Sequence, residues 1–245
     1  MKRFFISLLS LPLLLGAADI YLAGDSSMQD YPETRAPLTG WGTALKSRVK
    51  EGCNVFNMAL GGRSSKSFIT EKHWEKLLSK AKKGDFVIIQ FGHNDTVAGE
   101  KNFYRFTQPE KVFPHYLKIY IAEARERGLI PVLCTQTMTC RFDKKGKSFN
   151  PPDSNAKYVD ACRKVAAETG CDLLDLNLYA MKKMDSIGEE AARKYYLYLE
   201  KGELSNYPDG KQDSCHLRME GAKFYAAAAV ELAKTQKLPL AELFK

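Results

Sequence analysis

The apolar residues of the chain form short, nearly continuous runs separated by longer amphipathic segments. Five runs, each bounded by glycine or polar residues, have the length of buried strands: 20–23, 55–58, 85–91, 130–135 and 172–176. Helical spacing over the intervening and following segments predicts helices at 41–49, 73–83, 109–127, 155–168, about 177–200 and 219–237. Because strands alternate with helices, the sheet is expected to be parallel and covered on both faces.

This alternation predicts an α/β fold with three layers, α/β/α, around a parallel five-stranded sheet. Residues 19–245 contain no linker, internal repeat or change of composition, which favours a single domain. Hydrophobic residues make up 44% and charged residues 27% of the chain, as in ordinary globular proteins, and this excludes a disordered, collagenous or coiled-coil protein.

The first 18 residues have the pattern of a cleavable signal peptide. Lys2 and Arg3 precede an apolar run over 4–15, and the small residues Gly16-Ala17-Ala18 follow. The run is shorter than the roughly 20 residues of a membrane-spanning helix, and no later stretch reaches that length. We therefore expect export to the periplasm or the outside, with no integral membrane segment after cleavage. Removal of Lys2 and Arg3 lowers the formal charge of +8 by two, to about +6.

Export bears on the redox state of the cysteines. An oxidising compartment preserves disulfides, so one or two are expected here together with some buried free thiols, although the sequence leaves their pairing open. No C-x-x-C pair occurs, which argues against a zinc site or thioredoxin-like chemistry. The six cysteines are Cys53, Cys134, Cys140, Cys162, Cys171 and Cys215.

Polar motifs follow three of the predicted strands, and a fourth precedes the last helix. They are Gly24-Asp25-Ser26-Ser27, Gly61-Gly62-Arg63-Ser64, Gly92-His93-Asn94-Asp95 and Asp213-Ser-Cys-His216. The carboxyl ends of parallel strands meet at one edge of the sheet, where such folds bind ligands. Each motif by itself also suits an ordinary turn.

Together, the motifs supply the parts of serine-type acyl transfer. A serine hydroxyl is a weak nucleophile until a base accepts its proton, and histidine titrates near neutrality. A carboxylate three residues earlier can orient that imidazole. Backbone N–H groups and an asparagine amide can stabilise a developing oxyanion. The residues alone therefore indicate acyl transfer, without identifying the acyl group.

In order and placement, these motifs resemble the blocks of the SGNH (GDSL) hydrolase superfamily. Within it the chain most resembles the rhamnogalacturonan acetylesterases, on the additional stretches Gly40-Trp-Gly42, Asn57-Met-Ala-Leu-Gly-Gly-Arg-Ser-Ser65, Gln90-Phe-Gly-His-Asn-Asp95 and Ala122-Glu-Ala-Arg-Glu-Arg-Gly128. The resemblance covers essentially all of 19–245 and implies a flavodoxin-like sheet.

The resemblance implies a role for each matched residue. Ser26 would be the nucleophile, His216 the general base and Asp213 the residue that orients it. The backbone N–H groups of Ser26 and Gly62 and the side-chain amide of Asn94 would form the oxyanion hole. The implied reaction is hydrolysis of an acetyl ester through an acyl-enzyme, with no metal or other cofactor, on a plant cell-wall polysaccharide such as acetylated rhamnogalacturonan.

The chain departs from the family pattern at positions that are expected to border the substrate cleft. Cys215 and Leu217 flank His216 where the family commonly has threonine and an aromatic residue. Gln136 directly follows the strand that ends at Thr135, at a position where the family often has proline. A thiol nucleophile at Cys215 is therefore a rival reading, although the complete serine set argues against it. Arg63 and His93 are candidate substrate-binding residues, with Arg63 suited to a uronate carboxylate.

Several other functions compete with this one. An esterase for another acetylated glycan or a small acyl ester would use the same residues. The sequence shows no long apolar segment that could form a lid, and this disfavours large lipid substrates. A non-catalytic carbohydrate-binding protein would not need the complete motif set. The positive charge raises nucleic acid as a partner, but the lysines are spread along helices and export makes this improbable. We expect a monomer that binds an acetylated polysaccharide.

Overall fold

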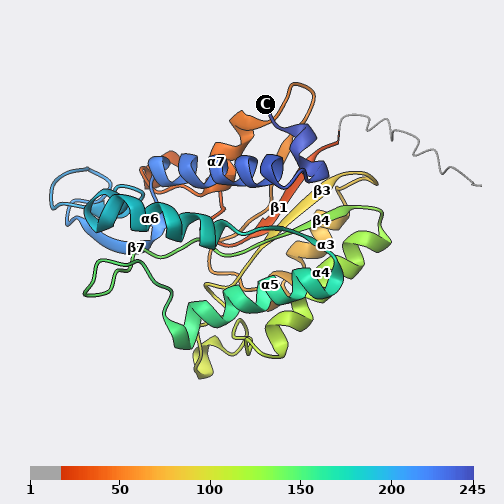
Figure 1. The fold of residues 1–245 in the computed structure, drawn as a ribbon, viewed down its shortest axis with the longest axis horizontal. Coiled ribbons are helices and arrows are strands. Elements are labelled where there is room, and N and C mark those ends of the chain that lie inside the picture. The colour runs from red at the N-terminus through yellow and green to blue at the C-terminus, as the bar shows by residue number, and fades with distance from the viewer. Residues whose placement is uncertain (1–17) are drawn as a thin grey trace, which may run out of the picture.

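In the computed structural model, which describes residues 18–245, a five-stranded parallel sheet forms the centre of the molecule (Figure 1). The strands lie in the order β2-β1-β3-β4-β5, which is the flavodoxin-like arrangement. Their bounds are β1 Ile20–Gly24, β2 Val55–Asn57, β3 Phe86–Gln90, β4 Ile130–Cys134 and β5 Asp172–Leu174. The expected three-layer α/β/α fold and its parallel sheet are confirmed.

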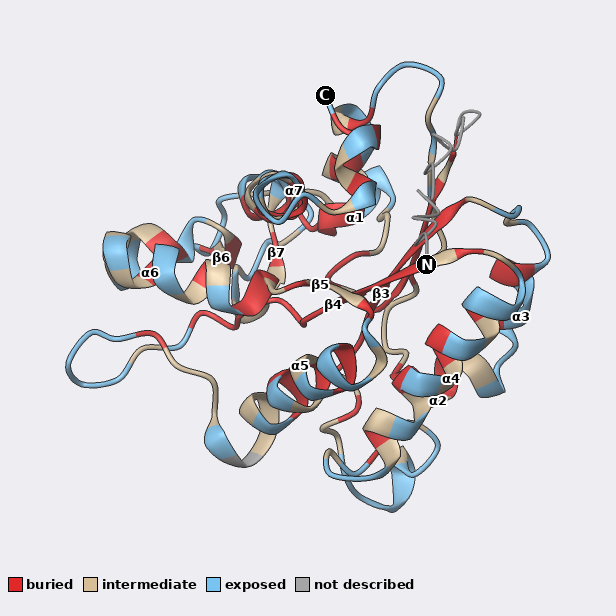
Figure 2. Ribbon diagram, turned by 45° about the vertical axis from the view of Figure 1, so that its right-hand side comes forward, coloured by how far each residue is buried: buried red, intermediate tan, exposed pale blue. Residues whose placement is uncertain are grey.

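Helices cover both faces of the sheet (Figure 2). On one face lie α1 Trp41–Leu45, α6 Leu176–Arg193 and α7 Met219–Thr235. On the other lie α2 Ser65–Thr70, α3 His73–Leu78, α4 Val112–Glu126 and α5 Lys157–Thr169. No helix within 18–245 combines the length and apolarity needed to cross a membrane. The predicted signal peptide lies almost wholly outside the described residues.

Alternation along each strand divides the core into two clusters, one on either face of the sheet. In β1, Ile20 and Leu22 pack into one cluster, whereas Tyr21 and Ala23 pack into the other. All five residues of β1 are buried, as expected of a strand covered on both faces. Burial of each large aliphatic side chain contributes roughly 1.5–3 kcal/mol, which fixes the register of the strands and with it their carboxyl ends.

The structure corrects several element bounds, most of all near the C-terminus. The helix expected over about 177–200 ends at Arg193, because Tyr196–Leu199 forms strand β6. It pairs antiparallel with β7, Lys211–Leu217, in a separate two-stranded sheet. β-Branched and aromatic strand signals are sparse in β7, which explains why it was not predicted.

All six cysteines are free thiols, so the expectation of one or two disulfides is wrong for this structure. The arrangement of the core explains the result. Cys134 and Cys140 belong to the cluster on one face of the sheet, and Cys162 and Cys171 to the cluster on the other. The sheet keeps these two groups apart, and disulfide formation requires Cα atoms within about 7 Å of each other.

Candidate active site

Ser26 occupies the turn that directly follows β1, at the carboxyl edge of the sheet. The carboxylate of the buried residue Asp25 shapes this turn by accepting a hydrogen bond from the Ser27 backbone N–H at 2.9 Å. The Ser27 hydroxyl lies 2.8 Å from Asp25 Oδ1 and 3.0 Å from Gln90 Oε1. Trp41 Nε1 donates to the same Gln90 oxygen at 2.9 Å. These buried bonds hold the turn while Ser26 itself stays partly exposed.

The glycine motif after β2 lies against the serine turn. The Leu60 N–H donates to the Gly24 carbonyl at 2.9 Å. A Cβ atom at Gly61 would lie only 2.7 Å from Gln29 Oε1 and 3.5 Å from Ser26 Cβ, so a larger residue there would displace the Gln29 side chain. Gly62 adopts φ +80°, a left-handed conformation that glycine takes readily.

The predicted oxyanion-hole donors are available in this arrangement. No described residue accepts a hydrogen bond from the backbone N–H of Ser26 or of Gly62. Asn94 Nδ2 donates one hydrogen to the Arg63 carbonyl at 3.1 Å, and its second hydrogen has no acceptor among residues 18–245. Unpaired donors at a partly exposed turn suit an anion that appears only during a reaction.

Asp95, next to Asn94, is buried beneath the site and stabilises the Asn94 turn through hydrogen bonds. Its buried carboxylate accepts hydrogen bonds from the Ser65 hydroxyl at 2.5 Å and from the Thr107 hydroxyl at 2.8 Å. Burial raises the pKa of Asp95 to about 6, although the Ser65 and Thr107 bonds lower it. The carboxylate thus links the Asn94 turn to the start of α2 and to the segment before α4.

Asp213 and His216 lie on β7, which is not part of the five-stranded sheet. Asp213 Oδ2 is 2.8 Å from His216 Nδ1, and Asp213 Oδ1 accepts the backbone N–H groups of Cys215 at 2.9 Å and His216 at 3.0 Å. The structure therefore brings together the predicted carboxylate and imidazole. No described residue bonds to His216 Nε2, which leaves this nitrogen available.

The pKa shifts of the pair fit an orienting carboxylate and a basic imidazole. Burial raises the pKa of Asp213, but hydrogen bonds from the His216 side chain and two backbone amides hold it well below its usual range. The bond to Asp213 raises the pKa of His216 above its usual value and outweighs burial, which lowers it. The charge of Asp25, in the serine turn, raises the pKa of His216 further.

Contacts between distant segments fix β7 against the sheet edge. The Thr39 N–H donates to the Leu217 carbonyl at 3.0 Å, and the Cys140 N–H donates to the Ser214 carbonyl at 2.8 Å. These bonds connect β7 to the loop before α1 and to the segment after β4. Since the Trp41 N–H in turn donates to the Ser27 carbonyl at 2.9 Å, the same loop joins β7 to the serine turn.

Cys215, the departure beside His216, interacts with His93. The Cys215 sulfur lies 3.9 Å from His93 Nδ1, and His93 Nε2 lies 3.1 Å from the Thr137 hydroxyl. Burial lowers the pKa of His93, but the charge and hydrogen bond of Cys215 raise it to about 9. Burial raises the pKa of Cys215, yet the neighbouring His93 lowers it overall. His93, a candidate substrate-binding residue, thus has two partners within the protein.

Arg63, the other candidate substrate-binding residue, also has internal partners. Its Nε donates to Glu71 Oε2 at 2.8 Å and its Nη1 to the Gly61 carbonyl at 3.0 Å. Because Glu71 already pairs with this guanidinium, a uronate carboxylate would have to compete for it. Gln136, another departure, is buried with neither amide atom hydrogen-bonded by a described residue, and its side chain packs against Gly92.

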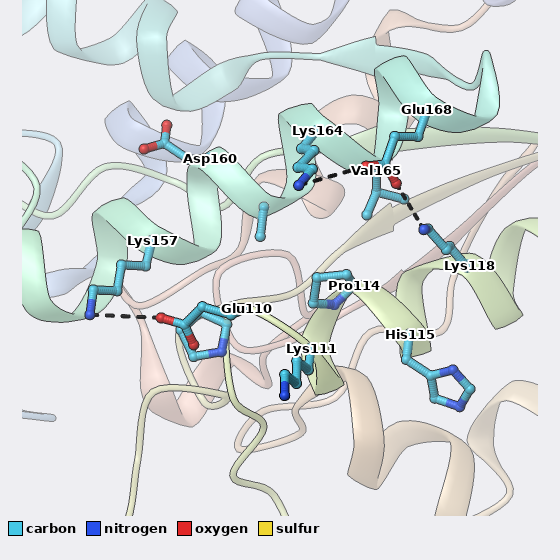
Figure 3. Close-up of a pocket in the computed structure, with 12 residues that line it drawn as sticks. Glu110, Lys111, Pro114, His115, Lys118, Lys157, Asp160, Lys164, Val165 and Glu168 are labelled. Atoms are coloured by element: carbon cyan, nitrogen blue, oxygen red, sulfur yellow. Dashed lines mark ion pairs between the residues drawn. The ribbon is translucent and has the colours of Figure 1, made fainter.

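A pocket of about 360 Å³ opens beside His93 and Cys215, and Thr139 and Arg141 also line it. A larger hollow of about 600 Å³ lies between α4 and α5, away from these groups (Figure 3). Its charged side chains pair mainly with one another, as Lys118 does with Glu168 at 2.8 Å. The smaller pocket is therefore the better candidate for a substrate cleft.

Some residues that shape the site were given no role in it by the sequence analysis. Gln90 and Trp41 fix the serine turn, and the Tyr31 hydroxyl donates to the Ser26 carbonyl at 3.0 Å. A signal did exist for Gln90, because it is the polar residue in an otherwise apolar buried strand. Trp41 is fully buried.

The chain is similar to a known protein family and to several named proteins. The model of the GDSL-like lipase/acylhydrolase family matches residues 22–224. Rhamnogalacturonan acetylesterase RhgT of Bacillus subtilis is 33% identical over 90% of this chain and 91% of that protein. The probable rhamnogalacturonan acetylesterase YesY of the same organism is 34% identical over 92% of this chain and 97% of that protein.

Solved structures of esterases and related proteins share the fold of this chain. Protein YxiM of Bacillus subtilis is 25% identical, with a TM-score of 0.75 over 91% of this chain and 57% of that chain. An acetylxylan esterase of Geobacillus stearothermophilus shares the fold, with a TM-score of 0.60 at 15% identity. On its motifs, its fold and these relatives, the chain belongs to the GDSL-like lipase/acylhydrolase family, the SGNH hydrolases, among the rhamnogalacturonan acetylesterases.

Proposed function

We propose that this chain, a carbohydrate acetylesterase of the SGNH type, removes acetyl groups from acetylated rhamnogalacturonan by a Ser-His-Asp mechanism. The observation that carries the mechanism is the 2.8 Å contact between Asp213 Oδ2 and His216 Nδ1, with His216 Nε2 left free. An imidazole anchored at Nδ1 presents its other nitrogen as a base.

The reaction proceeds in two halves. His216 Nε2 takes the Ser26 proton as the hydroxyl oxygen attacks the acetyl carbonyl, and Asp213 stabilises the resulting imidazolium. The carbonyl oxygen becomes an oxyanion that accepts hydrogen bonds from Ser26 N–H, Gly62 N–H and the Asn94 amide. The carbon–oxygen bond to the sugar breaks, and His216 returns the proton to the sugar oxygen. Water then repeats the sequence on the acetyl-serine and releases acetate.

The choice of substrate is supported by likeness and by charge. Two relatives with high coverage are named as rhamnogalacturonan acetylesterases, one of them as a probable one. The formal charge of +8, about +6 after loss of the proposed signal peptide, favours encounter with an acidic polysaccharide. The proposed site of action is outside the inner membrane, because Lys2, Arg3 and the following apolar run have the pattern of a signal peptide.

A substrate panel tests this proposal. Purified protein is incubated with acetylated rhamnogalacturonan, acetylated xylan and an aryl acetate, and the release of acetate is measured. We expect several-fold faster release from rhamnogalacturonan than from xylan. Equal or reversed rates would remove the pectic assignment in favour of another acetylated glycan, and turnover of the aryl acetate alone would favour a small-ester esterase. Absence of turnover on all three would overturn the esterase itself.

A further inference from the structure

The segment between β3 and α4 exposes two adjacent aromatic rings close to the candidate active site. Phe103 is 73% and Tyr104 51% exposed, and no other large hydrophobic side chain among the described residues is as exposed as either. Exposing such rings to water is unfavourable, and neighbouring exposed apolar side chains often mark a binding surface.

Two cations lie against these rings without a carboxylate partner among the described side chains. Lys66 Nζ is 4.5 Å from the centre of the Phe103 ring and donates to the Phe103 carbonyl at 3.0 Å. The Arg105 guanidinium is 5.8 Å from the centre of the Tyr104 ring. It bonds to neutral amide oxygens, those of Asn102 at 2.7 Å and Asn94 at 3.4 Å. Both charges therefore remain available to an anion.

This surface is joined directly to the candidate oxyanion hole. Arg105 contacts the side chain of Asn94, whose amide is a proposed oxyanion donor. Thr107, two residues further on, bonds to the Asp95 carboxylate at 2.8 Å. Lys66 lies in the first turn of α2, close after the Gly61-Gly62 motif. A polymer whose acetyl group reaches Ser26 therefore has a short path to the two rings.

The hollow between α4 and α5 provides a contrast. It also contains lysines, but Lys118 and Lys164 both pair with Glu168, and Lys157 lies 3.8 Å from Glu110 (Figure 3). Three of the four lysines that line the hollow thus have a carboxylate partner. Lys66 and Arg105 are instead partnered by neutral groups, so their charge is more available to an acidic ligand.

We propose that Phe103, Tyr104, Lys66 and Arg105 form a subsite for a uronate-bearing stretch of the polysaccharide, next to the sugar that loses its acetyl group. The C–H face of a sugar ring would pack on an aromatic ring, and the uronate carboxylate would pair with Lys66 or Arg105. This subsite rests on the proposed function, since it binds the polymer whose ester Ser26 attacks.

The stacking part is tested with the double variant Phe103→Ala/Tyr104→Ala. The measured quantity is kcat/KM on acetylated rhamnogalacturonan divided by kcat/KM on an aryl acetate, which is too small to reach the subsite. We expect this ratio to fall about tenfold, mainly through KM on the polymer. The matched control is Leu178→Ala, an apolar side chain on α6 that is 39% exposed, and it should leave the ratio unchanged.

The charge part is tested with Lys66→Met, which removes the charge and keeps most of the length of the side chain. At low salt this ratio should fall about threefold in the variant. The variant's kcat/KM on the acidic polymer should also depend less on salt concentration than that of the wild type. Lys80→Met, an exposed lysine after α3, is the control. Unchanged ratios in both test variants of an active enzyme would overturn the subsite and leave the esterase standing. A wild type without any esterase turnover would instead overturn the proposed function.

Discussion

The two halves of the candidate active site are built in different ways. The serine half, with Ser26, Gly62 and Asn94, follows the carboxyl ends of three adjacent parallel strands, β2, β1 and β3. The histidine half, with Asp213 and His216, lies on an antiparallel hairpin outside that sheet. The central sheet positions the first half directly, whereas the second depends on how the hairpin docks.

The hydrogen bonds of the two halves reflect this difference. In the serine half, the fully buried side chains of Asp25, Gln90 and Trp41 hold the turn. In the histidine half, the Asp213–His216 pair is local and partly exposed, with 37% of the His216 side chain and 17% of the Asp213 side chain accessible. Changes in the serine half should therefore lower the rate of the chemical step. Changes in the hairpin should lower that rate too, and should also alter the position and the pKa of the His216 imidazole.

The largest expected effect is that of Ser26→Ala in the serine half. Loss of the proposed nucleophile should lower kcat for an aryl acetate by roughly 10⁴–10⁶-fold without changing the melting temperature, because Ser26 donates no side-chain hydrogen bond to a described residue. Ser47→Ala, an exposed serine, is the control. Turnover within tenfold of wild type would exclude Ser26 as the nucleophile.

In the histidine half, Asp213→Asn should lower kcat by about 10⁴-fold, since the imidazole loses its anchor and its preferred tautomer. The pH dependence of kcat/KM tests the same pair. His216 acts as a base only when neutral, so wild-type kcat/KM should rise with pH through a limb above the ordinary histidine value of about 6.5, because Asp213 raises the pKa of His216. In residual Asp213→Asn activity this limb should move to lower pH. A limb at the same pH in both proteins would contradict the proposed pair.

A smaller loss is expected for Asn94→Ala, which removes one of the three proposed oxyanion donors. We expect kcat for the aryl acetate to fall about 10²–10³-fold with little change in KM, since the donor acts on charge formed in the transition state. Steady-state kinetics on both ester substrates would measure this effect. A rise in KM at unchanged kcat would assign Asn94 to substrate binding instead.

The smallest effect is expected for Tyr196→Phe, which tests how the hairpin docks. The Tyr196 hydroxyl, buried on β6, donates to the Met138 carbonyl at 2.6 Å and lies 3.0 Å from the Tyr225 hydroxyl. Its loss should lower the free energy of unfolding by about 1–2 kcal/mol, as measured by urea denaturation. Leu199→Ala is expected to cost more, about 2–4 kcal/mol, because it leaves a cavity. An unchanged stability in Tyr196→Phe would show that this bond does not secure the hairpin.

The same contrast explains what could be predicted from the sequence. The five parallel strands and the serine-half motifs were predictable, because buried strands appear as apolar runs and their turns as glycine-containing motifs. The segment 196–199 is apolar enough to continue the helical pattern before it, so β6 was predicted as helix. The chain gives little strand signal over 211–217, where charged and polar residues predominate.

Within the site, the residue types were predictable, but several partners were not. Local spacing was sufficient for the Asp213–His216 contact, three residues apart. The contact of His93 with Cys215 joins residues 122 positions apart, and the Arg63–Glu71 pair depends on the path of α2. Only the folded chain shows that Arg63 forms an ion pair with Glu71, whereas Lys66 and Arg105 have no carboxylate partner within residues 18–245.

The central claim is that Ser26, activated by His216, is the nucleophile. The most direct measurement is to react the wild type with a fluorophosphonate, which phosphonylates activated serines, and to map the modified peptide by mass spectrometry. The account predicts one adduct per molecule, on Ser26, with loss of aryl acetate turnover in proportion to labelling, and little labelling in Asp213→Asn. Full inactivation with Ser26 unmodified, or turnover that resists the reagent but is lost on alkylation of Cys215, would contradict it.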